Sequence, residues 1–208
     1  MHRDTHLAQT TAARPLTADT LPGWPTFPTP FLPALRLERW RLDRVDEVLD
    51  AVRASLPDLQ LWMPWAQTMP TREEQFQALA NGEAAFDAGT DFNYLVRECD
   101  TGEMVGGSGL HRRIGPNAIE IGYWVRSDRH GRGYATAAAG ALTDAAFTHL
   151  ADVERVEIHM DRANVASARI PGKLGFRYLR SDPKPKTALG HTGTDLIWAM
   201  HRGEWTPR

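Results

Sequence analysis

The sequence has little that would crosslink the chain or anchor it in a lipid. It contains 1 cysteine, Cys99, in 208 residues, so no disulfide can form within the chain, which is consistent with a reducing, cytoplasmic location. No apolar run is long enough to span a membrane, and the N-terminus lacks the uninterrupted apolar core of a secretory signal. The formal net charge of -2 gives no electrostatic reason to expect nucleic acid or an anionic membrane as a partner.

What is present is the composition of an ordinary globular protein, with 42% hydrophobic and 24% charged residues. The length suits one α/β domain with a substantial core. Residues 1–34 are rich in Thr, Pro and Ala and favour extended chain, so we expect an N-terminal arm at 1–34 and one domain at 35–208. Trp24, Phe27 and Phe31 could pack on the domain or on a second subunit, which leaves a homodimer open, and simple disorder is the alternative.

Hydrophobic periodicity predicts the secondary structure. Alternating apolar residues predict strands, most clearly at 119–125 and 156–160, and helical spacing predicts helices at 46–55, 71–86 and 135–146. Thr71 and Glu74 have the spacing of a capping box. Further strands are expected at 35–42, 92–97, 104–111, 176–180 and 195–200, and a short helix near 166–174. The mixture predicts an α/β fold with helices on both faces of a central mixed sheet.

The most informative stretch is His130-Gly131-Arg132-Gly133-Tyr134-Ala135, between a predicted strand and a predicted helix. A glycine turn that opens a helix presents backbone N–H groups and the positive end of the helix dipole, which bind phosphate oxygens. A P-loop is excluded because no Lys-Ser or Lys-Thr follows a glycine. A dinucleotide fingerprint fits poorly because Thr136 stands where a third glycine is needed. An ordinary glycine loop is the alternative for the motif taken alone.

The same stretch resembles the pyrophosphate-binding motif of the GCN5-related N-acetyltransferases (GNAT), with His130 in place of the usual Gln or Arg. Other blocks are similar to the RimJ/RimL branch of that family. They are Ile119-Glu120-Ile121-Gly122-Tyr123-Trp124, Asn164-Val165-Ala166-Ser167 with Lys173-Leu174-Gly175-Phe176, the segment 59–66, and the last strand and tail at 195–205. The resemblance runs from about Leu35 to Trp205 in the family's order.

The resemblance implies the GNAT acyl-CoA N-acyltransferase fold, with a splayed, mostly antiparallel sheet. It implies an acyltransferase that moves acetyl from acetyl-CoA, its co-substrate, to a primary amine by direct attack, without a metal. The RimJ/RimL branch acetylates ribosomal proteins, so the expected acceptor is the α-amine of a ribosomal or other protein N-terminus. A small-molecule amine and a larger acyl group such as succinyl are alternatives, and a non-catalytic acetyl-CoA-binding module is a rival of another class.

By resemblance, coenzyme contacts come from the glycine turn, the strand before it and the helix near 166–174. Gly122 is a candidate bulge at which the strand parts from its neighbour. The backbone beyond it would pair with the pantetheine arm, and an N–H near Val125 would polarise the thioester carbonyl. Asn164 would bind the pantetheine amide, with a helix N-cap as the alternative, and Lys173 and Arg169 could reach phosphates or be solvated. The expected set is Trp124, Val125, Arg126, His130, Gly131, Arg132, Gly133, Tyr134, Ala135, Asn164, Ser167 and Lys173.

Three residues are candidates for proton transfer. Glu120 shares a strand face with Trp124, opposite the apolar face, and is the candidate general base, directly or through a water. Its alternatives are a solvated glutamate or one that binds substrate electrostatically, and His111 is a second candidate base. Ser167 is the candidate donor to the leaving thiolate, or a cofactor contact or a helix cap. Pro171 occupies the position at which many acetyltransferases carry a tyrosine acid.

Trp62-Met63-Pro64-Trp65 is an apolar segment between two predicted helices. The resemblance implies that it lines the acceptor groove, and a core-packing loop is the alternative. Cys99, just before the expected turn at 100–102, is expected to be a bystander rather than a nucleophile.

Overall fold

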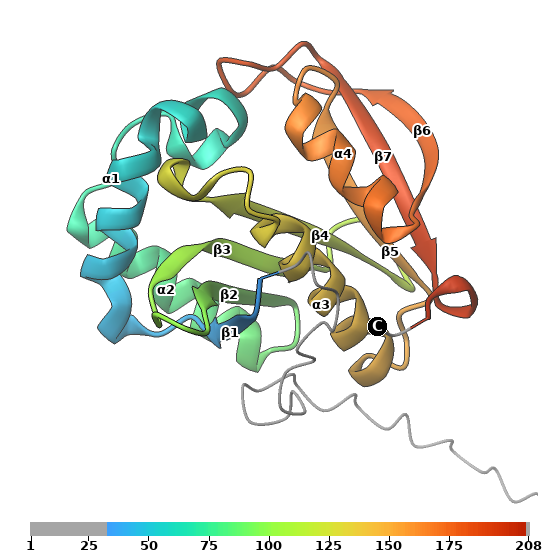
Figure 1. The fold of residues 1–208 in the computed structure, drawn as a ribbon, viewed down its shortest axis with the longest axis horizontal. Helices are drawn as coiled ribbons and strands as arrows, with labels where there is room; N and C mark the ends of the chain where they lie inside the picture. Colours follow the sequence, from blue (N-terminus) through green and yellow to red (C-terminus); the bar gives the residue numbers. More distant parts are fainter. Residues whose placement is uncertain (1–32, 207–208) are drawn as a thin grey trace, which may run out of the picture.

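A seven-stranded mixed sheet forms the centre of the protein (Figure 1), with its strands in the order β1-β2-β3-β4-β5-β7-β6. The computed structural model describes residues 33–206, so the expected arm lies outside the described residues except for its last two. Only β4 and β5 pair in parallel, and every other neighbouring pair is antiparallel. The strands are β1 Leu35–Arg39, β2 Asp91–Glu98, β3 Met104–His111, β4 Ala118–Val125, β5 Arg155–Asp161, β6 Arg177–Pro183 and β7 Thr194–His201.

The helices are α1 Val45–Trp62, α2 Arg72–Asp87, α3 Tyr134–His149 and α4 Val165–Leu174. The capping box is present, because Thr71 and Glu74 each bind the other's backbone N–H. The prediction for the first helix was too short, since α1 continues past Ser55 and through Pro57. Burial of Leu59 beyond the proline stabilises the last turns and offsets the backbone hydrogen bond that Pro57 cannot make.

The core lies on both sides of the sheet. Ile119 and Ile121 of β4 pack with apolar residues of α3, such as Leu142, in one cluster. A second cluster joins residues of α1, including Val48 and Val52, with partly buried Trp124 from the opposite side of β4. The predicted arrangement, with helices covering both sheet faces, is therefore confirmed. None of the helices in residues 33–206 has both the length and the apolar character needed to cross a membrane.

The sheet opens between β4 and β5. The two strands pair only where Ala118–Ile121 meets Arg155–Ile158, and each then runs on without the other. The pairing of β4 with β3 is regular through Gly122, so Gly122 is not a bulge and that expectation was wrong. The predicted splay is nonetheless present, and it begins at Gly122, directly after the last pair, Ile121 with Ile158.

Candidate functional site

A cleft of about 810 Å³ fills the opening between β4 and β5. Its walls come from the end of α1, the second half of β4, the turn before α3, the end of β5, the start of α4 and the loop between β6 and β7. All residues expected to bind the coenzyme or to transfer protons line it except Arg126 and His111, so residues from distant parts of the chain meet at one place. The wall includes Glu120, Trp124, Val125, His130, Gly131, Arg132, Gly133, Tyr134, Ala135, Asn164, Ser167 and Lys173.

At one end of the cleft, the glycine turn leads into α3. Gly131 and Gly133 have φ angles of 77° and 87°, a backbone conformation that residues with a side chain rarely adopt. No side chain caps α3 at Gly133. The first N–H groups of the helix, which have no partner within the helix, are therefore available as hydrogen-bond donors. A Cβ placed on Gly131 would meet nothing within 4 Å. Together with Arg132 and Lys173, this turn suits a phosphate-bearing ligand.

The free edge of β4 presents alternate backbone groups to the cleft. The Arg126 N–H donates to the Val105 carbonyl at 2.9 Å, and the Gly122 carbonyl accepts from Ser108 on β3 at 2.8 Å. Even-numbered residues here therefore direct their backbone toward β3, and Tyr123 and Val125 direct theirs to the open side. The expected pairing of Trp124 and Arg126 backbone groups with a ligand in the cleft is thus wrong, while Val125 keeps a free N–H there.

His130 turns its ring back to the strand end. Its Nε2 donates to the Val125 carbonyl at 3.0 Å, and its Nδ1 lies 4.0 Å from the Asp58 carboxylate. Asp58 also accepts a hydrogen bond from Ser127 in the short turn before His130. The side chain at this position therefore fixes the turn against α1, while the turn's backbone remains available for binding.

Across the cleft, α4 begins with Asn164, whose side chain caps the Ser167 N–H at 3.1 Å. The capping alternative for Asn164 is therefore present. Ser167 Oγ lies 2.9 Å from the Tyr123 hydroxyl, and burial raises the pKa of Tyr123 to about 12, so this phenol stays protonated. The sequence pattern placed Tyr123 on an apolar face. The available signal was that a buried tyrosine hydroxyl needs a hydrogen-bond partner.

Glu120 lies at the other end, only 8% exposed. Arg113 holds its carboxylate with two hydrogen bonds of 2.8 and 2.6 Å. Burial acts to raise the pKa of Glu120, but the Arg113 hydrogen bonds and charge outweigh it and hold the pKa below its usual value. Glu120 is therefore a charged group near neutral pH and a weak proton acceptor.

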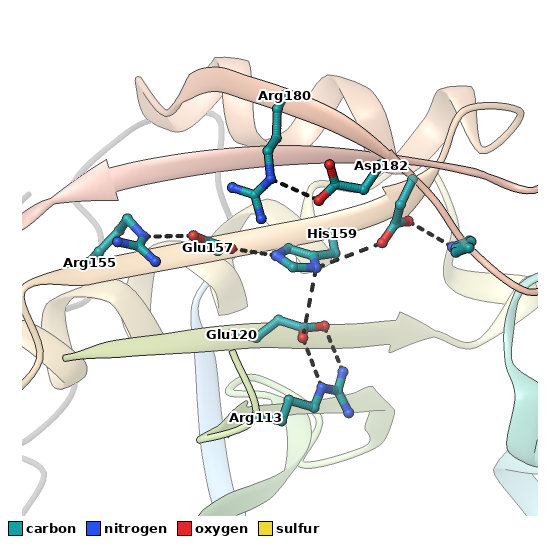
Figure 2. A network of polar contacts seen from close by, with 9 residues as sticks. Arg113, Glu120, Arg155, Glu157, His159, Arg180 and Asp182 are labelled. Carbon is teal, nitrogen blue, oxygen red and sulfur yellow. Dashed lines mark hydrogen bonds and ion pairs between the residues drawn. The ribbon is translucent and has the colours of Figure 1, made fainter. Parts of the chain in front are cut away.

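Sequence analysis missed several polar side chains around Glu120 (Figure 2). His159 on β5 lies between Glu157, 2.6 Å from its Nε2, and the carboxylates of Glu120 and Asp195, 4.0 and 3.7 Å from its Nδ1. Lys184 binds Asp195 at 2.7 Å. The signal was the face of β5 opposite Val156 and Ile158, which carries only ionisable residues. The strand prediction rests on the apolar face of β5 alone, so no role was predicted for its ionisable face.

Two other expectations concern residues near this end. His111 lies outside the cleft wall, where its Nδ1 contacts Asp91 at 2.7 Å and burial lowers its pKa. Trp62, Met63 and Pro64 line the cleft, whereas Trp65 packs edge-on against Trp124. Three of the four residues of the segment therefore line the cleft, and Met63 also packs against the second core cluster.

The loop between β6 and β7 reaches across to the end of α1 (Figure 1). Its Leu189 and Gly190 N–H groups donate to the carbonyls of Gln60 and Leu61, and His191 contacts the Trp62 carbonyl at 3.2 Å. Residues of this loop and of the end of α1 line the same cleft as Glu120. Cys99 is exposed and outside the cleft.

The acetyltransferase (GNAT) domain family matches residues 34–177. The solved structure of RimL, a ribosomal L7/L12 alpha-N-protein acetyltransferase in complex with coenzyme A, is 22% identical with a TM-score of 0.73, over 80% of this chain and 93% of that one. RimJ of Mycobacterium smegmatis, in complex with CoA-disulfide, is 22% identical with a TM-score of 0.74, over 83% and 84%.

A third similar structure is the microcin C7 self-immunity acetyltransferase MccE in complex with acetyl-CoA and AMP. It is 15% identical with a TM-score of 0.72, over 83% of this chain and 97% of that one. These are likenesses of fold. A comparison with curated protein sequences finds no match.

Proposed function

This chain belongs to the GNAT family and is an acyl-CoA-dependent N-acetyltransferase, and from that premise we propose that it acetylates the α-amine of a protein N-terminus. One observation carries the proposal. A single cleft joins a phosphate-binding turn, a free strand edge and a carboxylate end, in that order. Direct transfer from a coenzyme A thioester to an amine requires three such parts: one that holds the coenzyme's phosphates, one that holds its pantetheine arm and one that holds the amine.

The residues at the first end fit coenzyme A. The uncapped start of α3 and the turn Gly131–Gly133 would bind the pyrophosphate through backbone N–H groups. Arg132 and Lys173 add positive charge at the cleft wall. The Tyr123 backbone groups on the open edge of β4 would pair with the pantetheine arm, because the Val125 carbonyl already accepts from His130. Bound acetyl-CoA supplies the activated acetyl group as its thioester.

Residues at the centre of the cleft would assist the transfer itself. The free Val125 N–H is our proposed donor to the oxygen that becomes negatively charged. Ser167, hydrogen-bonded to the protonated Tyr123 hydroxyl, is our proposed donor to the departing sulfur. No covalent bond to the enzyme is needed, because the amine attacks the thioester directly.

The carboxylate end would receive the acceptor. Glu120 and Asp195 both line it, and two carboxylates attract a cationic α-ammonium group. The loop between β6 and β7 is hydrogen-bonded to the end of α1 and would narrow the entrance to the acceptor site. A narrow entrance favours an extended chain end over a folded protein surface. An α-amine has a pKa of roughly 7.7–8.0, against about 10.4 for lysine, so it needs less help to lose its proton. RimL, which shares this fold, acts on a ribosomal protein, and a ribosomal protein N-terminus is our first candidate.

The test is thiol release from acetyl-CoA in the presence of three matched acceptors. These are a peptide with a free N-terminus, the same peptide with a blocked N-terminus and an internal lysine, and a panel of small primary amines. We expect turnover with the free N-terminus alone. Turnover confined to small amines would contradict the acceptor proposal. Coenzyme binding without turnover on any amine would indicate a binding module, and faster reaction with succinyl-CoA would change the proposed acyl group.

A further inference from the structure

His159 is the cleft residue with the best geometry for accepting a proton. It stands on β5, two residues beyond Glu157, which pairs with Glu120 on β4, and its side chain is 16% exposed. Figure 2 shows the ring between Glu157 on its own strand and Glu120 on β4. The ring therefore lies where an amine bound between Glu120 and Asp195 would have to lose its proton.

Glu157 sets which ring nitrogen carries the proton. Its side chain is 1% exposed and binds Arg155 at 2.6 Å and His159 Nε2 at 2.6 Å. Burial acts to raise the pKa of Glu157, but the hydrogen bonds from His159 and Arg155 keep it below its usual value, so it is a charged acceptor. A charged acceptor keeps the proton on Nε2. Nδ1 is then the nitrogen with the free electron pair, and it faces the cleft.

The carboxylates around the ring already have partners. Glu120 pairs with Arg113, Asp195 with Lys184, and Glu157 with Arg155. On β3, His111 contacts Asp91, and on β5, Asp161 is held by Thr192 and the Ala163 N–H. None of these groups is hydrogen-bonded to His159 Nδ1, which is therefore open to the acceptor.

Glu120, in contrast, is poorly suited to take the proton. Both of its oxygens are bound to Arg113, and protonating it would break a buried, charge-assisted pair. Its charge is better used to hold the ammonium group. The distances of 4.0 and 3.7 Å from Nδ1 to Glu120 and Asp195 are longer than hydrogen bonds, so an amine can enter between these groups.

We propose that His159 Nδ1 is the general base of the transfer, positioned by Glu157 and Arg155, with Glu120 and Asp195 holding the acceptor's ammonium group. An ammonium first gives one proton to Nδ1. His159 passes this proton to solvent. The freed nitrogen electron pair forms the C–N bond, the C–S bond breaks, and sulfur keeps the electron pair of the C–S bond and takes a proton from Ser167, which regains one from solvent. The second N–H proton of the attacking nitrogen then leaves for solvent through the deprotonated Nδ1. This inference rests on the proposed function.

The experiment compares His159→Gln with His111→Gln, a histidine one strand further from the cleft. Glutamine can still donate to Glu157 but has no titrating nitrogen. The substrate is the amine that gives turnover in the thiol-release assay. With it, we expect kcat/KM of His159→Gln to fall by about 100-fold or more. The pH dependence of its rate should follow the ionisation of the amine alone and so differ from that of the wild type. His111→Gln should stay within about threefold of the wild type and keep its pH profile.

Three results would bear on the inference differently. Coenzyme affinity within about twofold of the wild type in His159→Gln, measured by calorimetry, is expected and separates base loss from misfolding. A wild-type rate and pH profile in that variant would overturn the role of His159 and leave the acetyltransferase proposal standing. Absence of turnover in the wild type on every amine, despite coenzyme binding, would overturn the proposed function and this inference with it.

Discussion

The two ends of the cleft are built in different ways. The coenzyme end is a run of consecutive residues, 130–135, whose backbone carries the binding groups. The amine end is a set of side chains from β4, β5, β7 and two loops, linked by ion pairs. The first kind of site depends on backbone conformation and tolerates a changed side chain such as His130. The second depends on charge, so a single neutral substitution alters it.

The sharpest test of the backbone end is Gly133→Asp. The φ of 87° at Gly133 disfavours any side chain, and a carboxylate there would face the phosphates. We expect coenzyme affinity, measured by calorimetry, to fall by about 100-fold, or ~2.7 kcal/mol. Gly115→Asp is the control, because Gly115 has a φ of 103° in open space away from the cleft wall. Equal losses in both variants, or unchanged affinity in Gly133→Asp, would contradict the pyrophosphate assignment.

Glu157→Gln tests whether the amine end depends on buried charge. Removing the charge weakens the interactions of Glu157 with Arg155 and His159. We expect the free energy of unfolding at pH 7 to fall by about 2 kcal/mol. Because the folded-state pKa of Glu157 lies below its ordinary value of 4.5, this contribution is complete above pH 4.5. It is lost as the pH falls through the lower folded-state value.

Urea unfolding of both proteins at pH 7, 5 and 3.5 measures this difference. Asp50→Asn is the control, since the Asp50–Arg53 pair is exposed and its loss should change stability by less than about 0.5 kcal/mol. A difference between wild type and Glu157→Gln that stays the same at pH 3.5 would show that the charge is not its source.

Glu120→Gln separates substrate binding from proton transfer. We expect KM for the amine to rise about tenfold, ~1.4 kcal/mol, because the ammonium loses one carboxylate, while coenzyme affinity is unchanged. Since the pKa of Glu120 lies below its usual value, its removal should leave the pH–rate profile in the neutral range as it was. Loss of the neutral-range limb in this variant would make Glu120 the base and count against His159.

The smallest effect concerns the hydroxyl pair at the centre of the cleft. We expect Ser167→Ala and Tyr123→Phe each to lower kcat by about fivefold, ~1 kcal/mol, because the leaving sulfur loses a nearby donor. If the two hydroxyls act together through their 2.9 Å contact, the double variant should be little slower than either single one. Fully multiplicative losses would mean that they act separately.

Sequence patterns predicted the strand, the glycine turn and the helix of the proposed coenzyme end because these elements are local. Two glycines, a strand before them and an alanine-rich helix after them lie within a few dozen residues, and their spacing fixes the turn. The amine end was predicted only at Glu120 and at Trp62–Pro64. Arg113, His159, Lys184 and Asp195 have no spacing that links them, because they come together only when β4, β5 and β7 pair. The direction of each backbone group on β4 likewise depended on its register with β3.

By itself, then, the sequence determined the order of strands and helices, the splayed sheet through its family resemblance, and a glycine turn at the start of a helix, which we propose binds phosphate through its backbone. The tertiary structure alone decided which cation pairs with each carboxylate, that His159 lines the cleft whereas His111 does not, and which β4 amides are free. The physical reason is that periodicity and turn chemistry act between neighbours along the chain. Charge pairing, burial and strand register act between residues such as Glu120 and His159, 39 positions apart by their numbers, that meet only in the folded sheet.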